Sequence, residues 1–597
     1  MCEHEENENK FFIPKILLTS IFFVFGFKYS FLFYVAYIVV AYDIVIESIK
    51  NIFKGKIFDE NFLMTIATFG ALCIKELPEA VMVMFLYTIG EYLEDKAVDK
   101  SKDSITELMD IRPDFANIIT KDGILSVKPS DVEINDIILI KPGEKIPLDG
   151  VVVEGNSQID TSSLTGESLP KRINVGQNVN SGCINIDSVI KVKVLKTFEN
   201  STVSKILAMV EEASSKKSKS ENFITRFAKI YTPFVVVLAL LIAVVPPYFI
   251  DGNWIERALT FLVISCPCAL VISIPLGFFA GIGAASRVGI LVKGSIYLEK
   301  LSQLKNVVFD KTGTLTNGNF EVVKINSTNK DILKYAAIAE SGSNHPIAKA
   351  IKKAYGKDTP VQKITEISGK GVKTEFDGKE ILVGNNKLID IKNKENEIGT
   401  VVYVMVNGEY IGDIVIYDTI KNDSKTAISY LNDHNINTAI LSGDNITNVK
   451  SIQKELNIKE AMAELLPNEK VQEFEKIMKK YKGITAFVGD GINDAPVITR
   501  ADVGVAMGGL GSDAAVSASD VVIMDDKPSK LINAIKISKK TMNIVKQNII
   551  FAIGIKVLFL ILSAFGFMTM WGAIFADVGV TLLAILNALR ILKIKQF

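Results

Sequence analysis

The stretch NVVFDKTGTLT, residues Asn306–Thr316, decides the fold of the larger soluble part of this chain. Its apolar start is typical of a buried strand, which ends on Asp310 and enters a loop of Gly and Thr. The reactive edge of an open α/β sheet lies at the carboxyl ends of its strands, so Asp310 is placed as a nucleophile toward phosphate. Lys311, Thr312 and Thr314 supply charge and donors for phosphoryl oxygens. The alternative is an N-cap Asp after an ordinary strand, and the complete motif argues against it.

Two further segments predict the rest of this sheet edge. Both ILSGDN (Ile440–Asn445) and ITAFVGDGINDAP (Ile484–Pro496) have the pattern of a strand followed by a Gly/Asp loop. Asp490 and Asp494 are hard oxygen ligands suited to Mg(II), which a transferring phosphoryl group needs. Lys470, in LLPNEK, is a candidate point charge for the phosphate.

The surrounding patterns predict three soluble units. From about Leu291 to Thr541 apolar strands alternate with amphipathic helices, which is typical of a parallel doubly wound sheet. Between Glu321 and Tyr417 the pattern changes to antiparallel strands and predicts an inserted α+β subdomain. Short alternating runs over about Asp110–Ser215, separated by Gly, Pro and Asp, indicate a small β-rich domain.

The remaining sequence is apolar enough to enter a bilayer. The chain has 597 residues, of which 48% are hydrophobic and 22% charged, and its mean hydropathy is +0.28. Three apolar blocks, Phe11–Val98, Phe227–Ala285 and Ile544–Leu592, predict about four, two and two spanning helices, about eight in all. Basic residues gather on the side of the two insertions, which the positive-inside rule makes cytosolic together with both termini. The acidic N-terminus is unlike a signal peptide, and we expect a multi-pass protein of the plasma membrane.

The predicted domain order is a cytosolic tail (1–10), four membrane helices (11–109), the β-rich domain (110–215), two membrane helices (216–290), the first part of the α/β domain (291–320), the inserted subdomain (321–417), the second part of the α/β domain (418–541) and two last membrane helices (542–597). Lys plus Arg and Asp plus Glu each number 67, so nothing in the charge balance favours a nucleic-acid partner.

The motif SCPCALV lies inside a predicted span and holds two of the five cysteines, Cys266 and Cys268. Pro267 removes a backbone donor and opens the helix, which lets both sulfurs turn inward and frees carbonyl groups. Two buried apolar cysteines beside a kink are the alternative. Asp577 and Lys556, in the last two spans, are each costly at bilayer depth and can neutralise one another; an interfacial Asp and a snorkelling Lys are the alternative.

A ligand set of two thiolates and a carboxylate favours the binding of Zn(II), Cd(II) or Pb(II). Cu(I) prefers sulfur and gains little from the Asp577 carboxylate. The residues therefore indicate a soft or borderline divalent ion.

The motifs DKTGTLT, SGD (Ser442–Asp444), GDGINDAP and TGES (Thr165–Ser168) resemble the P-type ATPases, and the resemblance covers nearly the whole chain. It implies that Mg-ATP phosphorylates Asp310, with Asp310, Thr312 and Asp490 holding the magnesium ion. It also implies a haloacid-dehalogenase-like phosphorylation domain and an actuator domain whose Glu167 positions the hydrolytic water. Ser442 and Asp444 form an SGD where TGD is commoner, and Lys421 stands where an Arg is frequent.

The inserted subdomain would then bind nucleotide. SNHPIA (Ser343–Ala348) resembles the His-Pro signature of the heavy-metal subclass, class IB, and the resemblance implies contacts from Glu340, His345, Gly369 and Gly371. The Cys-Pro-Cys motif, the Lys of the penultimate span and the Asp of DVG resemble the zinc/cadmium/lead branch. In that branch the positions of Glu79 and Glu91 line the release path; interfacial acids at helix ends are the alternative.

The function we expect is ATP-driven export of Zn(II), Cd(II) or Pb(II) through an aspartyl phosphate, by a monomer in a lipid bilayer. The alternatives are a Cu(I) exporter and a membrane-anchored phosphatase of the haloacid-dehalogenase type with a redox-sensing Cys pair. In the acidic tail, Cys2 and His4 could hold a metal weakly, or the tail could simply be frayed.

Overall fold

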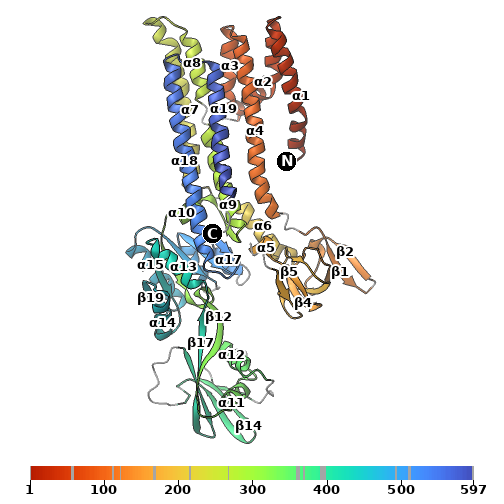
Figure 1. Cartoon of the computed structure of the whole chain (residues 1–597), viewed down its shortest axis with the longest axis vertical. Coiled ribbons are helices and arrows are strands. Elements are labelled where there is room, and N and C mark those ends of the chain that lie inside the picture. The colour runs from red at the N-terminus through yellow and green to blue at the C-terminus, as the bar shows by residue number, and fades with distance from the viewer. Residues whose placement is uncertain are drawn as a thin grey trace.

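The computed structural model describes residues 2–54, 60–109, 113–121, 123–165, 170–213, 217–265, 268–343, 345–357, 364–367, 370–386, 388–389, 399–490, 494–508 and 513–593. Figure 1 shows a bundle of long helices at one end and three soluble units at the other. The marks for the N- and C-terminus both lie toward the soluble end of the bundle.

The bundle is built from nine helices in the described ranges: α1 (Cys2–Gly26), α2 (Phe31–Phe53), α3 (Glu60–Cys73), α4 (Leu77–Met109), α7 (Lys219–Val244), α8 (Trp254–Ile264), α9 (Cys268–Ser286), α18 (Lys530–Ala564) and α19 (Met570–Leu589). Helix α9 packs against α18 and α19, and α4 packs against α2 and α19. Because α1 begins at Cys2, a helix runs through the stretch predicted as a tail.

Five helical stretches in the described part are long and apolar enough to cross a membrane, and two shorter apolar helices, 12–26 and 61–73, stand beside them. The five are Phe31–Phe53, Ile230–Tyr248, Trp254–Ser286, Lys530–Ala564 and Met570–Lys593. Large apolar side chains such as Ile230 and Phe234 are exposed on these helices, as expected for a surface that contacts lipid.

The first soluble unit is a β-rich domain, as its alternating runs predicted. Its six-stranded antiparallel sheet has the order β2-β1-β3-β9-β4-β7, and a three-stranded sheet β6-β5-β8 lies beside it. The strands are β1 (Ala116–Thr120), β2 (Gly123–Val127), β3 (Ile137–Ile140), β4 (Gly150–Glu154), β5 (Ser157–Asp160), β6 (Lys171–Ile173), β7 (Asn178–Val179), β8 (Ile184–Asn185) and β9 (Ile190–Val194). Helix α6 (Thr202–Ala213) leads back toward the bundle.

The second unit is the predicted doubly wound sheet, with seven strands in the order β10-β22-β21-β20-β11-β18-β19. They are β10 (Ile290–Val292), β11 (Leu304–Asp310), β18 (Asn437–Leu441), β19 (Glu460–Met462), β20 (Ile484–Gly489), β21 (Val503–Met507) and β22 (Val521–Ile523). All neighbours are parallel except β10 with β22. Val307, Val308 and Phe309 are fully buried because helices cover both faces, so β11 is a central strand.

The third unit is inserted between the two halves of the second. Its six-stranded antiparallel sheet has the order β12-β17-β16-β15-β14-β13 and carries helices α11 (Ile332–Ala339) and α12 (Pro346–Tyr355). The strands are β12 (Thr316–Asn326), β13 (Ile364–Ile367), β14 (Gly371–Phe376), β15 (Lys379–Gly384), β16 (Thr400–Val406) and β17 (Glu409–Ile420). The long strands β12 and β17 pair from Thr316 to Asn326 and form the neck seen in Figure 1.

Candidate functional site

Asp310 is the last residue of β11, between β18 and β20 at the carboxyl edge of the parallel sheet. The chain then turns through Lys311–Leu315, with Gly313 at a φ of +77°. A Cβ at Gly313 would collide with the carboxylate of Asp490, which follows β20. The loop therefore needs glycine for two reasons, its left-handed backbone and the close approach of Asp490.

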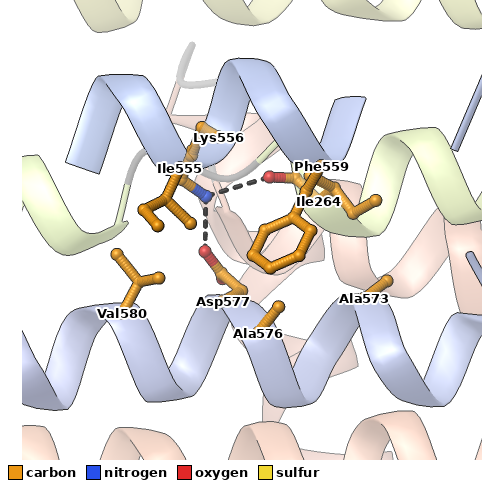
Figure 2. Close-up of a pocket in the computed structure, with 8 residues that line it drawn as sticks. All are labelled: Ile264, Ile555, Lys556, Phe559, Ala573, Ala576, Asp577 and Val580. Carbon is orange, nitrogen blue, oxygen red and sulfur yellow. Dashed lines mark hydrogen bonds and ion pairs between the residues drawn. The ribbon is translucent and has the colours of Figure 1, made fainter. Parts of the chain in front are cut away.

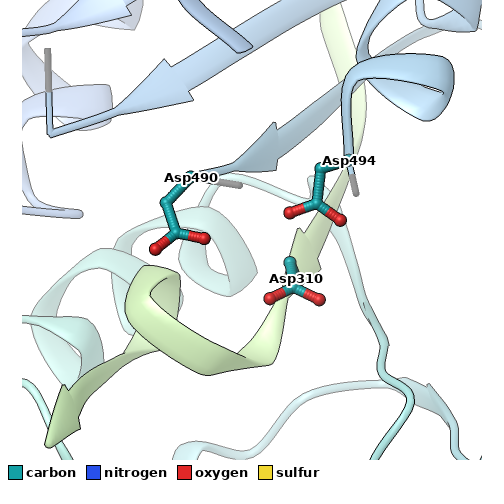
Figure 3. Close-up of side chains that lie close together, drawn as sticks. All are labelled: Asp310, Asp490 and Asp494. Atoms are coloured by element: carbon teal, nitrogen blue, oxygen red, sulfur yellow. The ribbon is translucent and has the colours of Figure 1, made fainter. Parts of the chain in front are cut away.

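Three carboxylates meet at this edge, as the strand–loop motifs predicted. Oxygens of Asp310, Asp490 and Asp494 all lie within 4.8 Å of one another, and Figure 3 shows the three side chains facing a common space. Asp494 is buried and directly precedes α16 (Ala495–Arg500), where, among the described residues, its side chain makes no capping hydrogen bond. Burial and, after it, the charge of Asp494 raise the pKa of Asp310 to about 7 and that of Asp490 to about 6.

Lys470 is the cation among these acids. It comes from α15 (Pro467–Lys480), and its Nζ donates to Asp310 Oδ1 at 2.6 Å and to Asp494 Oδ1 at 3.1 Å. Burial lowers the pKa of Lys470, but the charges of the two acids outweigh it and raise the pKa overall. One ammonium opposes three carboxylates, so the cluster retains negative charge for a further cation.

The cluster fits Mg(II). Its donors are hard carboxylate oxygens close enough together to share an ion, and the raised pKa of Asp310 and of Asp490 reflects repulsion and burial that a dication would relieve. Thr312, the other predicted magnesium contact, is exposed on the same loop.

The SGD loop is tied to the loop after Asp310. The buried Lys311 forms an ion pair with Asp444, and Ser442 Oγ accepts from the backbone N–H of Asp444 at 3.1 Å. Lys311 also lies 3.9 Å from the buried Asp418, whose pKa burial raises and a hydrogen bond from Thr316 lowers.

Lys421 contacts the loop after Asp310, and the sequence alone assigned this residue no role. Its Nζ donates to the carbonyl oxygen of Gly313 at 2.5 Å and lies 3.9 Å from Asp526. Burial lowers the pKa of this lysine. Two signals in the sequence could have pointed to it: its position directly after β17, and the Arg that is frequent there in the family that the chain resembles.

In the inserted unit, Glu340 and His345 lie in one turn between α11 and α12. Glu340 is buried, and burial raises its pKa while a hydrogen bond from Ser343 lowers it. His345 is exposed and caps α12, its Nδ1 accepting from the N–H of Ile347 at 3.3 Å. Gly371 begins β14, against which α11 packs, and its φ of +150° and close approach to Val383 exclude a side chain. Gly369 lies outside the described residues.

The membrane site lies where α8 ends at Ile264 and α9 begins at the buried Cys268; Cys266 and Pro267 lie outside the described residues. Lys556 on α18 forms an ion pair with Asp577 on α19, and both are buried. The same ammonium donates to the carbonyl oxygen of Ile264 at 2.9 Å. Figure 2 shows both interactions in a small pocket lined by Ile264, Ile555, Lys556, Phe559, Ala573, Ala576, Asp577 and Val580.

The two acids predicted on the release path lie on one helix. Glu79 is in the first turn of α4, and in the described part its Oε2 is buried without a hydrogen-bond partner. Glu91 is half-buried on the same helix, about 18 Å further along the axis at 1.5 Å per residue. They are therefore at different depths. Glu167 lies outside the described residues, just after α5 (Ser162–Thr165).

Two parts of the chain match known families. Residues 304–502 match haloacid dehalogenase-like hydrolases, and residues 110–211 match the P-type ATPase actuator domain. The chain is 53% identical to a cadmium, zinc and cobalt-transporting ATPase of Bacillus subtilis, over 95% of this chain and 83% of that one. It is 48% identical to a zinc-transporting ATPase of Synechocystis, over 94% of this chain and 80% of that one. Among solved structures, a zinc-transporting PIB-type ATPase in the E2.Pi state is similar, with a TM-score of 0.63, 34% identity and coverage of 98% and 99%.

Proposed function

This chain belongs to the heavy-metal-transporting P-type ATPases, and we propose that it exports Zn(II) and Cd(II), and also Pb(II), across the plasma membrane. One observation carries the cargo assignment: the buried ion pair of Lys556 and Asp577 beside the end of α8, next to Cys-Pro-Cys. A carboxylate beside two thiols suits a borderline or soft dication. An all-sulfur site for Cu(I) would have no use for the carboxylate.

The chemical step begins at Asp310. Its carboxylate oxygen attacks the γ-phosphorus of ATP, the bond to the β-phosphate breaks, and ADP leaves. Lys470, within 2.6 Å of the nucleophile, balances charge on the acceptor and on the transferring group. Asp310, Asp490 and Thr312 would hold Mg(II), which when bound neutralises developing phosphoryl charge.

Other groups prepare and reverse this step. Lys311 and Asp444 keep the DKTGT and SGD loops together, so the phosphate would meet a fixed set of donors. Glu340, His345, Gly369 and Gly371 would bind the nucleotide. Glu167 would position the water that hydrolyses the aspartyl phosphate, which returns Asp310 to its free form.

Transport uses the membrane residues. Cys266, Cys268 and Asp577 would bind the ion from the cytosolic side. In the phosphorylated, outward-open state Lys556 would displace the ion and pair with Asp577 or Glu79, and Glu79 and Glu91 would guide the ion out. We propose cytosolic termini and soluble units, and a monomer as the working form.

Metal-stimulated ATP hydrolysis by the purified chain tests the proposal, with Zn(II), Cd(II), Pb(II) and Cu(I) compared in the presence of added thiol. We expect stimulation by the three divalent ions and little by Cu(I). Stimulation by Cu(I) alone would assign the chain to copper export. Phosphoenzyme formation that no metal affects, and that Cys266→Ala leaves unaltered, would favour a phosphatase.

A further inference from the structure

The ammonium group of Lys556 binds two oxygens rather than one. Its first partner is the carboxylate of Asp577, and its second is the backbone carbonyl of Ile264, 2.9 Å away. All three residues are buried. Figure 2 shows the two bonds diverging from the single nitrogen atom.

The Ile264 carbonyl belongs to the last turn of α8, which ends at this residue. Carbonyls in the last turn of a helix lack the partner that the next turn would supply. At membrane depth water does not replace that partner, so such an oxygen is matched by another group of the protein. Here that group is a cation, the strongest kind of partner a neutral carbonyl can have.

The proposed transport site has one side-chain ligand fewer than Zn(II) usually takes. Zn(II) usually takes four ligands from nitrogen, sulfur and oxygen. Cys266, Cys268 and Asp577 supply three side-chain atoms. In this structure the lysine ammonium stands in for a bound cation, and it marks Asp577 and Ile264 as the two oxygens that face a positive charge.

We propose that the backbone carbonyl oxygen of Ile264 is a further ligand of the transported ion, which rests on the export function proposed above. Lys556 occupies both oxygen ligands when the ion is absent. Ion binding therefore requires the ammonium to leave the carbonyl as well as the carboxylate. A hard carbonyl oxygen also suits Zn(II) and Cd(II) better than Cu(I), so this ligand adds to the choice of cargo.

An ester in place of one peptide bond tests this ligand with every side chain unchanged. Replacing Ser265 by its α-hydroxy acid analogue turns the Ile264 carbonyl into an ester carbonyl, a weaker donor to a metal. The matched control is the same replacement at Ser273, which is also a buried serine after an isoleucine. The measurement is the Zn(II) or Cd(II) concentration that half-stimulates phosphorylation by ATP. We expect it to rise roughly 10-fold for the Ser265 ester, as for loss of a metal-site partner. For the Ser273 ester it should stay within about 2-fold of the wild type.

Phosphorylation by inorganic phosphate, with Mg(II) present and the transported metal absent, serves as the folding check, because it needs Asp310 and not the cargo. The proposal is overturned if both esters are phosphorylated this way and respond to metal alike. If the Ser265 ester is not phosphorylated by phosphate, infrared difference spectra of the wild-type chain labelled with carbonyl-13C isoleucine decide instead. A Cd(II)-induced band that is lost in Ile264→Leu supports the ligand, and an unchanged spectrum rejects it. A wild-type chain that no divalent metal stimulates would instead reject the export function.

Discussion

The Nζ of Lys470 lies 2.6 Å from the Oδ1 of Asp310, although 160 residues separate the two in the chain. The same ammonium reaches Asp494, so a single lysine holds the nucleophile against its acidic neighbour. Without Lys470, the carboxylate of Asp310 would lose the positive charge that offsets repulsion from Asp490 and Asp494. The geometry makes Lys470 a group that favours the ionised form of the nucleophile and holds it in place.

We therefore expect Lys470→Gln to slow phosphoenzyme formation from ATP by roughly 100-fold or more, since removing one preorganised group that stabilises developing charge costs about 100- to 1,000-fold in rate. Rapid-quench measurement with radiolabelled ATP gives the rate. Lys476→Gln is the control, because Lys476 is on the same helix and pairs with Glu473 at the surface. Equal rates for the two variants would contradict the role of Lys470.

Gly313 and Gly318 form a matched pair for the loop after Asp310. Both have positive φ values, +77° and +65°, so alanine strains the backbone at each by roughly 1–2 kcal/mol. Only at Gly313 would the new methyl group collide with Asp490; at Gly318 the nearest heavy atom is 3.5 Å away. We expect Gly313→Ala to raise the Mg(II) concentration needed for phosphorylation at least about 10-fold, and Gly318→Ala to act on thermal stability alone. A Mg(II) requirement shifted equally in both would contradict the collision.

Burial also makes stability depend on pH at this site. Asp310 has an ordinary pKa of 3.8 and a folded pKa of about 7, so the folded chain binds a proton here that the unfolded chain has lost. Its contribution is present at low pH and is lost as the pH rises from about 4 to about 7. In EDTA, Asp310→Asn should therefore raise the free energy of unfolding at pH 8 by on the order of 4 kcal/mol but hardly at pH 4, and thermal unfolding at the two pH values measures the difference. A gain that is independent of pH would contradict this assignment.

The sequence predicted the meeting of Asp310, Asp490, Asp494 and Lys470 for a physical reason. Asp310 ends one strand of the parallel sheet, and Asp490 and Asp494 follow another; the carboxyl ends of such strands share an edge whatever the loops between them do. The same logic predicted the doubly wound unit, its antiparallel insertion and the β-rich domain from strand periodicity. These features depend on local patterns that repeat.

Other contacts could not be predicted because they depend on how segments far apart in the chain are placed in space, which no local sequence pattern encodes. Lys421 reaches the Gly313 carbonyl only because β17 returns beside β12, and no local motif encodes that register. Pro267 predicted free carbonyl groups at this place, but the sequence could not say that Lys556 would bind the carbonyl of Ile264 in particular.

Glu299 offers a prediction about how the soluble part holds the bundle. It lies on α10 (Ser295–Ser302), and its Oε2 accepts from the backbone N–H groups of Lys219, at 2.8 Å, and Ser220, at 3.4 Å, where α7 begins. Helix starts leave such groups unpaired and favour negative charge. We expect Glu299→Ala to lower stability by about 1–3 kcal/mol and Glu299→Gln, which keeps an acceptor oxygen, by less. Thermal unfolding measures both, with the exposed Glu455→Ala as control; equal losses in alanine and glutamine variants would contradict the capping role.

Lys556→Met tests the counter-charge in the membrane directly. The change leaves the buried carboxylate of Asp577 without its cation, and an unpaired buried charge costs about 3–5 kcal/mol. We expect the metal-free variant to have a lower melting temperature, and Zn(II) to raise that temperature by more than it does in the wild type. Turnover at saturating Zn(II) should fall, because the Lys556–Asp577 ion pair can no longer form as the ion is released. Adding Asp577→Asn should recover the metal-free stability, since the charge itself is then gone. Lys546→Met, at an exposed position of the same helix, is the control. If it lowers the metal-free melting temperature as much as Lys556→Met does, the ion pair is not the source of the effect.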